Sequence, residues 1–159
     1  MGSLMSNNRD NLYRPCVGMM LLNGNNEVFV GQRIDKTSDA WQMPQGGIDA
    51  GEEPLVAAMR ELLEEIGTND VTLLASIDKW LYYDLPPELV PIFWNGKYVG
   101  QKQQWFLMRL NDGAVINLNT PHPEFCAYKW VQPQELPSIA VSFKQQLYTD
   151  VIEQFLNCL

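Results

Sequence analysis

The sequence is poor in the residues that build several common kinds of site. Its three cysteines, Cys16, Cys126 and Cys158, are scattered, and none pairs with another in the CxxC spacing of a zinc site. We therefore expect free thiols and no disulfide framework. His122 is the only histidine, which excludes a zinc site built from several histidines, and nothing near the cysteines suggests a catalytic Cys-His pair.

Positively charged side chains are also scarce. Lysine and arginine total 11 against 19 aspartates and glutamates, which gives a formal net charge of −8. A surface of this charge repels nucleic acid and anionic lipid, so we expect no DNA partner, and a phosphate-rich substrate would need metal ions or a local basic patch. The apolar run Val17–Leu22 is much shorter than the roughly 20 residues that span a bilayer. We expect a cytoplasmic protein without a membrane segment.

The size of the chain suits one globular domain. Its 159 residues are 46% hydrophobic, which is enough to build a substantial core. Residues 1–12 offer little to bury, so we expect a flexible tail there and a single domain over residues 13–159. The predicted order of elements is strand, strand, helix, strands, helix, which favours the α/β class with a mixed sheet between helices.

Turn and cap residues mark the expected elements. Asn23-Gly24 supports a tight turn, which predicts a hairpin of strands over 16–22 and 27–31. Pro54 and Gly67 predict a helix between them, and its expected buried face is Leu55, Ala58, Met59, Leu62 and Ile66. Further strands are expected within 71–83, 104–110 and 125–131, and Pro133 and Pro137 are expected to break the chain after the last of these. Ser142 predicts the N-cap of a last helix, whose expected buried face is Phe143, Leu147, Val151, Phe155 and Leu159.

Three carboxylates stand close together on the predicted helix. Glu61, Glu64 and Glu65 occupy positions i, i+3 and i+4, so they project to one side of the helix, which we expect to lie away from its apolar face. Neighbouring carboxylates raise one another's pKa unless a cation compensates, and oxygen ligands suit Mg²⁺ or Mn²⁺. The alternative is an ordinary solvated helix face, on which glutamate is common. The glycine-rich loop over 45–53 favours a binding site, because glycine lets the backbone approach another group closely.

The loop and the helix together resemble the Nudix box, Gly-x5-Glu-x7-Arg-Glu-U-x-Glu-Glu-x-Gly-U, where U is a bulky aliphatic residue. The matching residues are Gly46, Glu52, Arg60, Glu61, Leu62, Glu64, Glu65 and Gly67. Thr68, at the last position, is the one departure, and it concerns packing rather than chemistry. The resemblance implies an α/β/α sandwich that binds divalent cations and hydrolyses a nucleoside diphosphate linked to another group.

The resemblance also implies roles for the box residues. Glu61 and Glu65 are expected to be the main ligands of two or more Mg²⁺ or Mn²⁺ ions, and Glu64 either a further ligand or the base for the attacking water. Arg60 is expected to orient the glutamates or the loop, or to form only a structural ion pair. The box residues expected to be structural are Gly46, Glu52 and Gly67. Cations beside a phosphoanhydride would neutralise its charge and make water more nucleophilic.

Segments outside the box extend the resemblance. Tyr13–Pro15, Trp41–Ile48, Gly100–Phe106 and Pro123–Phe125 are similar to the branch of the Nudix family that contains bacterial RNA pyrophosphohydrolases and plant-type diadenosine tetraphosphate hydrolases. This implies removal of pyrophosphate from 5′-triphosphorylated RNA, with asymmetric hydrolysis of diadenosine tetraphosphate or a related dinucleoside polyphosphate as the alternative. A non-catalytic nucleotide sensor is a second alternative, although such proteins usually lose box carboxylates.

The branch also implies functional residues outside the box. Glu124 is expected to join the metal site, with a loop cap as the alternative. Arg33 and Lys144 are expected to contact phosphate, unless they are ordinary surface cations. The residues expected to contact the rest of the substrate are Tyr83 and Phe143, by stacking on a base, and Gln103, by hydrogen bonding. Phe143 could instead pack the last helix. Because strand side chains alternate, only one of Tyr82 and Tyr83 can face the site.

Overall fold

A computed structural model describes residues 10–35 and 39–159 of the chain. The strands in these ranges are β1 (Tyr13–Leu22), β2 (Val28–Arg33), β3 (Gln45–Gly47), β4 (Val71–Ser76), β5 (Leu81–Asp84), β6 (Gly100–Leu110) and β7 (Phe125–Val131). The helices are α2 (Pro54–Ile66), α3 (Leu136–Ile139) and α4 (Gln145–Phe155), with short 3₁₀ turns that include η1 (Pro87–Leu89), η2 (Phe93–Gly96) and η4 (Ser142–Lys144). The predicted hairpin is confirmed, and the strand region over 71–83 divides into β4 and β5.

The strands form a mixed sheet in the order β4-β6-β1-β2-β7, with β3 paired to β1 and β5 to β6. β1 and β6 run parallel from the Tyr13–Gly100 pair to the Leu22–Arg109 pair. The other pairings are antiparallel, including β1 with β2, β2 with β7 and β4 with β6. The central parallel pair therefore places the first strand beside a strand far along the chain.

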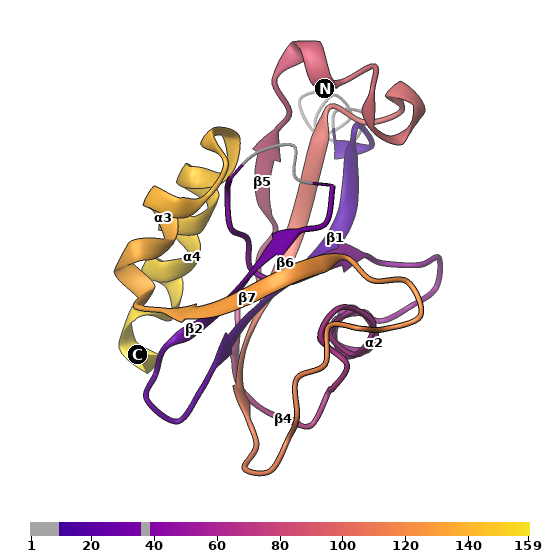
Figure 1. Ribbon diagram of the computed structural model, residues 1–159. Helices are drawn as coiled ribbons and strands as arrows, with labels where there is room; N and C mark the ends of the chain where they lie inside the picture. Colours follow the sequence, from indigo (N-terminus) through magenta and orange to yellow (C-terminus); the bar gives the residue numbers. More distant parts are fainter. Residues whose placement is uncertain (1–9, 36–38) are drawn as a thin grey trace.

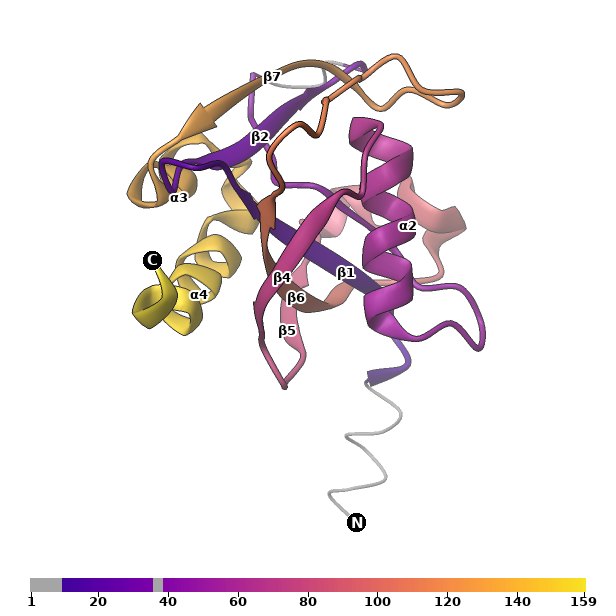
Figure 2. The ribbon, with the colours of Figure 1, turned by 90° about the horizontal axis from the view of Figure 1, so that it is seen from below.

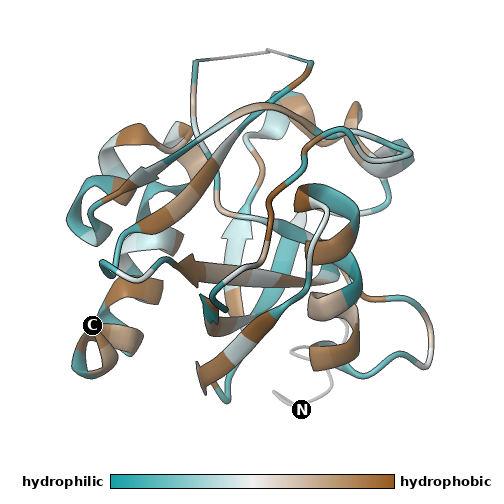
Figure 3. Ribbon diagram, turned by 60° about the horizontal axis from the view of Figure 1, so that its bottom comes forward, coloured by the Kyte–Doolittle hydropathy of each residue, from teal (hydrophilic) through white to brown (hydrophobic). Residues whose placement is uncertain are grey.

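The sheet lies between two layers of helices. α2 covers one face, and α3 and α4 cover the other (Figure 1, Figure 2). Side chains of β1 alternate between the layers, since Val17 and Met19 belong to the core beside α2, whereas Met20 and Leu22 belong to the core beside α4. Figure 3 shows hydrophobic segments both in the strands and in the helices that cover them. The expected α/β/α sandwich with a mixed sheet is confirmed.

Helix α2 begins and ends where the sequence predicts. Pro54 occupies its first turn, and Gly67 ends it with φ 77°, a left-handed conformation that glycine adopts easily. The Gly67 N–H donates to the Leu63 carbonyl at 3.0 Å. The expected buried face is wrong at Leu55, which is 39% exposed, and Ala57 is buried instead.

Two parallel rows of side chains make up the buried side of α2, because residues four apart stack on a helix. The rows are Ala58, Leu62 and Ile66, and Ala57, Glu61 and Glu65. Glu65 is 2% exposed and the Glu61 side chain is 14% exposed. The expectation that all three acids lie away from the buried face is therefore wrong for these two. Glu64, with a side chain 56% exposed, does face solvent.

The C-terminal segments differ from the prediction in detail. α4 has the expected apolar face, with Leu147, Val151 and Phe155 buried. The predicted Ser142 cap is wrong, because the turn η4 comes first, α4 follows it, and no side chain caps the helix. α3 was not expected, since Pro137 suggests a break, but proline is tolerated in the first turn of a helix.

The segment expected to be a tail is described only at its end. Residues 1–9 lie outside the described residues. Asp10 accepts hydrogen bonds from the Tyr82 hydroxyl at 2.7 Å and from Lys102 Nζ at 2.6 Å, which links it to β5 and β6. No helix within 10–35 or 39–159 combines the length and apolar character that crossing a membrane requires.

Candidate active site

A cleft of about 790 Å³ brings together residues from β1, β3, α2, the connection between β5 and β6, and the segment before α4. Its acidic lining residues are Asp35, Glu61, Glu65 and Glu124. Its cationic lining residues are Arg14, Arg33 and Lys144. Acids and cations from distant parts of the sequence therefore share one cavity.

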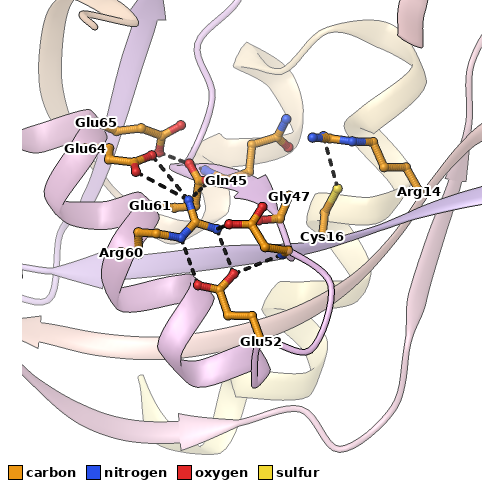
Figure 4. Close-up of polar contacts among 10 residues, drawn as sticks. Arg14, Cys16, Gln45, Gly47, Glu52, Arg60, Glu61, Glu64 and Glu65 are labelled. Carbon is orange, nitrogen blue, oxygen red and sulfur yellow. Dashed lines mark hydrogen bonds and ion pairs between the residues drawn. The ribbon is translucent and has the colours of Figure 1, made fainter. Parts of the chain in front are cut away.

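Arg60 is the centre of the polar contacts between the glycine-rich loop and α2 (Figure 4). Its guanidinium donates to both carboxylate oxygens of Glu52 at 2.9 and 2.8 Å, to Glu61 Oε1 at 2.9 Å and to the Gly47 carbonyl at 2.9 Å. The Glu64 carboxylate lies 3.4 Å away. Hydrogen bonding to Arg60 lowers the pKa of Glu52 to about 2. Arg60 thus orients Glu61 and also forms a structural ion pair, so both of its expected roles have a geometric basis.

Glu61 lies directly against the glycine-rich loop. A Cβ at Gly46 would overlap the Glu61 carboxylate, so the loop can pass this close only because residue 46 is glycine. Burial raises the pKa of Glu61, Arg60 opposes that effect, and the charges of Glu64 and Glu124 add to it. The Glu61 carboxylate is therefore fixed in place at the edge of the cleft.

Glu65 is a buried acid in the same cleft. Its Oε2 accepts a hydrogen bond from the Gln45 backbone N–H at 3.1 Å. Burial raises the pKa of Glu65 well above its ordinary value, and the charges of Glu124 and Glu61 raise it further. A buried carboxylate among like charges is costly to ionise unless a cation joins it.

Glu124, the residue just before β7, brings a further carboxylate into this acidic group. Its charge acts on both Glu61 and Glu65, as expected for a side chain that lines the same cleft. Arg33 Nη1 lies 3.9 Å from Glu124 Oε2. The Arg33 guanidinium also donates two hydrogen bonds to Asp35 Oδ2, from Nε at 3.1 Å and from Nη2 at 2.9 Å. Asp35 therefore holds Arg33 at the cleft beside the acids.

The donor set of the cleft fits a hard divalent cation that is shared with a phosphate ligand. Among the described residues, no group of three histidine, cysteine, aspartate or glutamate side chains is arranged to hold a metal ion. Mg²⁺ does not require such a cage, because it keeps several waters and binds through one or two carboxylates plus substrate phosphates. Burial and neighbouring carboxylates raise the pKa values of Glu61 and Glu65, an electrostatic cost of ionisation that a bound cation would offset.

Lys144 and Gln45 also line the cleft. Lys144 is 6% exposed, and its Nζ donates to Gln45 Oε1 at 3.1 Å. Burial lowers the pKa of Lys144 to about 8. The predicted contact of Gln103 with substrate is not supported, because its side-chain amide is fully buried. The amide donates hydrogen bonds to Gln45 Oε1 at 3.1 Å and to Gln101 Oε1 at 2.7 Å, and it accepts one from Trp105 Nε1 at 2.9 Å. Gln103 instead positions Gln45, which does line the cleft.

Tyr83 and Phe143, the residues expected to stack on a base, both line the cleft. Their rings stack on each other, with centroids 5.8 Å apart and an interplanar angle of 29°. A base that stacks on either ring would therefore use a face that the two do not share. Phe143 also packs against the core beside α4, which agrees with the alternative prediction that it packs the last helix. Tyr82 lies on the other side of β5, where it contacts Asp10.

Sequence reasoning missed two parts of the cleft. Arg14, at the start of β1, is brought to the cleft because β1 pairs with β6 and places it opposite Gln101. Nothing local to the sequence indicates that parallel pairing. The other part is an apolar wall from the β5–β6 connection, formed by Leu89, Ile92, Phe93 and Trp94. Its only sequence signal is a cluster of large apolar residues in a segment otherwise broken by proline and glycine.

Comparison with known proteins gives one consistent result. A profile of the NUDIX domain matches residues 12–151. A protein of Wolbachia pipientis subsp. Culex pipiens (strain wPip), named RNA pyrophosphohydrolase, is 51% identical over 149 residues, covering 92% of this chain and 91% of that protein. One of Rickettsia conorii with the same name is 52% identical over 144 residues, covering 90% and 89%.

Solved structures agree on the fold. The dihydroneopterin triphosphate pyrophosphohydrolase of E. coli superposes with a TM-score of 0.71 at 23% identity, covering 93% of this chain and 99% of that one. An Ap4A hydrolase of C. elegans superposes with a TM-score of 0.63 at 20% identity, covering 91% and 99%. Nudix hydrolases generally use divalent metal ions, as the donor set of this cleft would allow. The Nudix box in the sequence of this chain, its sandwich fold and the profile match agree. The chain belongs to the NUDIX domain family.

Proposed function

We propose that this chain removes pyrophosphate from the 5′ end of triphosphorylated RNA with the help of divalent cations. The observation that carries the proposal is that the buried Glu65 lies in the same cleft as Arg33 and Lys144. Acids alone would repel a polyphosphate and cations alone would not hold a metal, but together they suit a complex of the two. The relatives named RNA pyrophosphohydrolase, at 51% and 52% identity, support RNA as the substrate.

Glu61, Glu65 and Glu124 are the residues that would hold the cations, which we propose to be two or more Mg²⁺ or Mn²⁺ ions. Bound there, such ions would neutralise charge on phosphate oxygens and make a water molecule more nucleophilic. Glu64 does not line the cleft, and its carboxylate contacts Arg60. It would act as a ligand or base only after its side chain turns toward the cleft.

The cationic side chains would bind and orient the polyphosphate. The planar guanidinium groups of Arg14 and Arg33 can each donate two hydrogen bonds to phosphate oxygens, whereas Lys144 provides a compact positive charge. With a pKa of about 8, the Lys144 amine is mostly protonated at neutral pH and can pair with phosphate. Arg60 would keep Glu61 oriented, because its other hydrogen bonds anchor it to Glu52.

A parallel measurement of kcat/KM on 5′-triphosphorylated RNA and on diadenosine tetraphosphate, both with Mg²⁺, tests the proposal. We expect the RNA to be the better substrate and pyrophosphate to be the released product. A preference for the dinucleotide would reassign the substrate, since the same residues would serve it.

Two matched variants separate catalysis from simple binding. Glu61→Gln is expected to abolish turnover, whereas Glu153→Gln, an exposed change on α4 away from the cleft, should leave it unchanged. If the wild-type protein binds triphosphorylated RNA but neither it nor Glu153→Gln turns it over, the chain is a nucleotide sensor and the proposed activity is wrong.

A further inference from the structure

The β5–β6 connection exposes apolar side chains inside the cleft. We call Leu89, Ile92, Phe93 and Trp94 the apolar wall. Ile92 is 71% exposed and Phe93 is 40% exposed, although both line a cavity that also holds acids and cations. Apolar surface left open within a binding cleft gains free energy when a flat or apolar ligand group covers it.

The backbone beneath the wall is held in an uncommon conformation. Trp94 has φ 51° and ψ 36°, and Asn95 has φ 58° and ψ 29°, so two consecutive non-glycine residues are left-handed. This conformation is costly for a bulky residue such as tryptophan and persists only where the surroundings impose it. The Lys97 N–H donates to the Trp94 carbonyl at 3.1 Å, and the Trp94 ring packs edge-on against Tyr98 at 6.1 Å. The hydrogen bond helps to hold the backbone turn, and the contact with Tyr98 restrains the Trp94 ring.

Arg14 joins the apolar wall to the proposed phosphate site. Its guanidinium carbon lies 5.5 Å from the centroid of the Trp94 ring. The same guanidinium lies against Gly47, where an added Cβ would overlap it. Gly47 in turn accepts a hydrogen bond from Arg60, which holds Glu61. A ligand whose phosphates contact Arg14 would therefore have its next chemical group beside Phe93 and Trp94.

We propose that the apolar wall binds a nucleobase of the RNA substrate, which stacks on Phe93 and Trp94 while the 5′ phosphates lie among the acids and cations. The proposal rests on the proposed function and extends it to a second part of the ligand. Aromatic stacking accepts any base, because every base has a π-face, so the wall would add affinity for RNA with little sequence preference. It would also favour a nucleotide chain over inorganic polyphosphate.

Three trinucleotide RNAs with a 5′-triphosphate test the proposal: one intact, one abasic at the first position and one abasic at the second. Their dissociation constants are measured by calorimetry with Ca²⁺ in place of Mg²⁺, for the wild type, Trp94→Leu and Phe93→Leu. Trp80→Leu is the matched control, because Trp80 is also half-buried beneath a cation, Lys102 Nζ at 4.6 Å, but lies outside the cleft. Thermal unfolding checks that each variant is folded.

We expect Trp94→Leu and Phe93→Leu each to weaken binding of the intact RNA about tenfold, and Trp80→Leu to have no effect. One abasic RNA should bind the wild type about tenfold more weakly than the intact RNA, and Trp94→Leu should bind those two RNAs equally. The proposal is overturned if the wild type binds all three RNAs equally, or if Trp94→Leu still distinguishes them.

The wild-type protein's turnover of the intact RNA with Mg²⁺ is measured beside the binding. Base-dependent binding without release of pyrophosphate would support the apolar wall and overturn the proposed reaction. Pyrophosphate release with no dependence on the base or on Trp94 would support the reaction and overturn the wall.

Discussion

Among single residues, Glu65 combines deep burial with the negative charge that the proposed reaction needs. We predict that Glu65→Gln lowers kcat about 100-fold or more, because metal-borne charge stabilisation is worth several kcal/mol. Glutamine can still accept the hydrogen bond from the Gln45 N–H. Removal of a buried charge should also raise the melting temperature of the metal-free protein. Steady-state rates and thermal unfolding in chelator measure the two effects, and a fully active variant would contradict the assignment of Glu65.

The pH dependence of stability provides a second test of Glu65. Its pKa is raised in the folded protein, so the folded state keeps this proton at pH values where the unfolded chain has lost it. The resulting contribution to stability is complete below the ordinary value of 4.5 and is lost as the pH rises through the folded value. The stability of the metal-free wild type relative to Glu65→Gln should therefore fall above pH 4.5. Equal pH slopes for the two proteins would show that Glu65 titrates normally.

Lys144 should limit activity at alkaline pH. Since its folded-state pKa is about 8, its charge is present below that value and is lost as the pH rises through it. We predict that kcat/KM, which reports groups of the free enzyme, falls above pH 8 in the wild type. Lys144→Met should be about tenfold less active at neutral pH and should lack this decline. A decline that persists unchanged in Lys144→Met would assign it to another group.

At the scale of elements, the glycine-rich loop and α2 act as one unit, because Glu61 packs against Gly46. Gly46→Ala would displace the carboxylate, and a displacement of about 1 Å near reacting groups can cost about 100-fold in rate. Gly24→Ala is the matched control, since a Cβ there meets nothing within 4 Å. We predict that kcat falls about 100-fold in the first variant and stays unchanged in the second. Equal activity in both would show that the close approach has no catalytic importance.

Elements with strong local signals could be predicted from the sequence. Pro54 and Gly67 bound α2 correctly, and the Asn23-Gly24 turn marked the hairpin. Spacing alone did not show that Glu65 is buried, because burial depends on the loop and strands that pack over α2. α3 could not be predicted, because Pro133 and Pro137 indicate a break in the chain. In the structure each proline lies in the first turn of a short helix, where proline is tolerated.

At the scale of the whole molecule, the cleft depends on pairings between distant segments. The parallel pairing of β1 with β6 brings Arg14 to the cleft, and no local pattern predicts which strands become neighbours. Glu61, Glu65 and Glu124 could therefore be predicted as cleft residues, because their motifs are local in the sequence. Arg14 and Trp94 also line the cleft but could not be predicted in this way. Only the folded arrangement shows that these residues line the same cavity.

The charge of the whole molecule predicts a weak response to salt. The described cleft contains three cationic side chains, Arg14, Arg33 and Lys144, and the chain carries a net charge of −8. With about three phosphate contacts, kcat/KM for RNA should fall by only about 20-fold between about 50 and 200 mM salt at constant Mg²⁺. A thousandfold fall would reveal an extended basic path for RNA that the cleft does not contain.

The central claim is that the acidic cleft uses divalent cations to cleave the 5′-triphosphate of RNA. The most direct measurement follows RNA labelled at its γ-phosphate and identifies the labelled product with Mg²⁺, with chelator, and with Glu65→Gln in Mg²⁺. We predict labelled pyrophosphate from the wild type with Mg²⁺, and only intact RNA in the other two reactions. Labelled pyrophosphate formed at the full rate in chelator, or by Glu65→Gln, would contradict the claim.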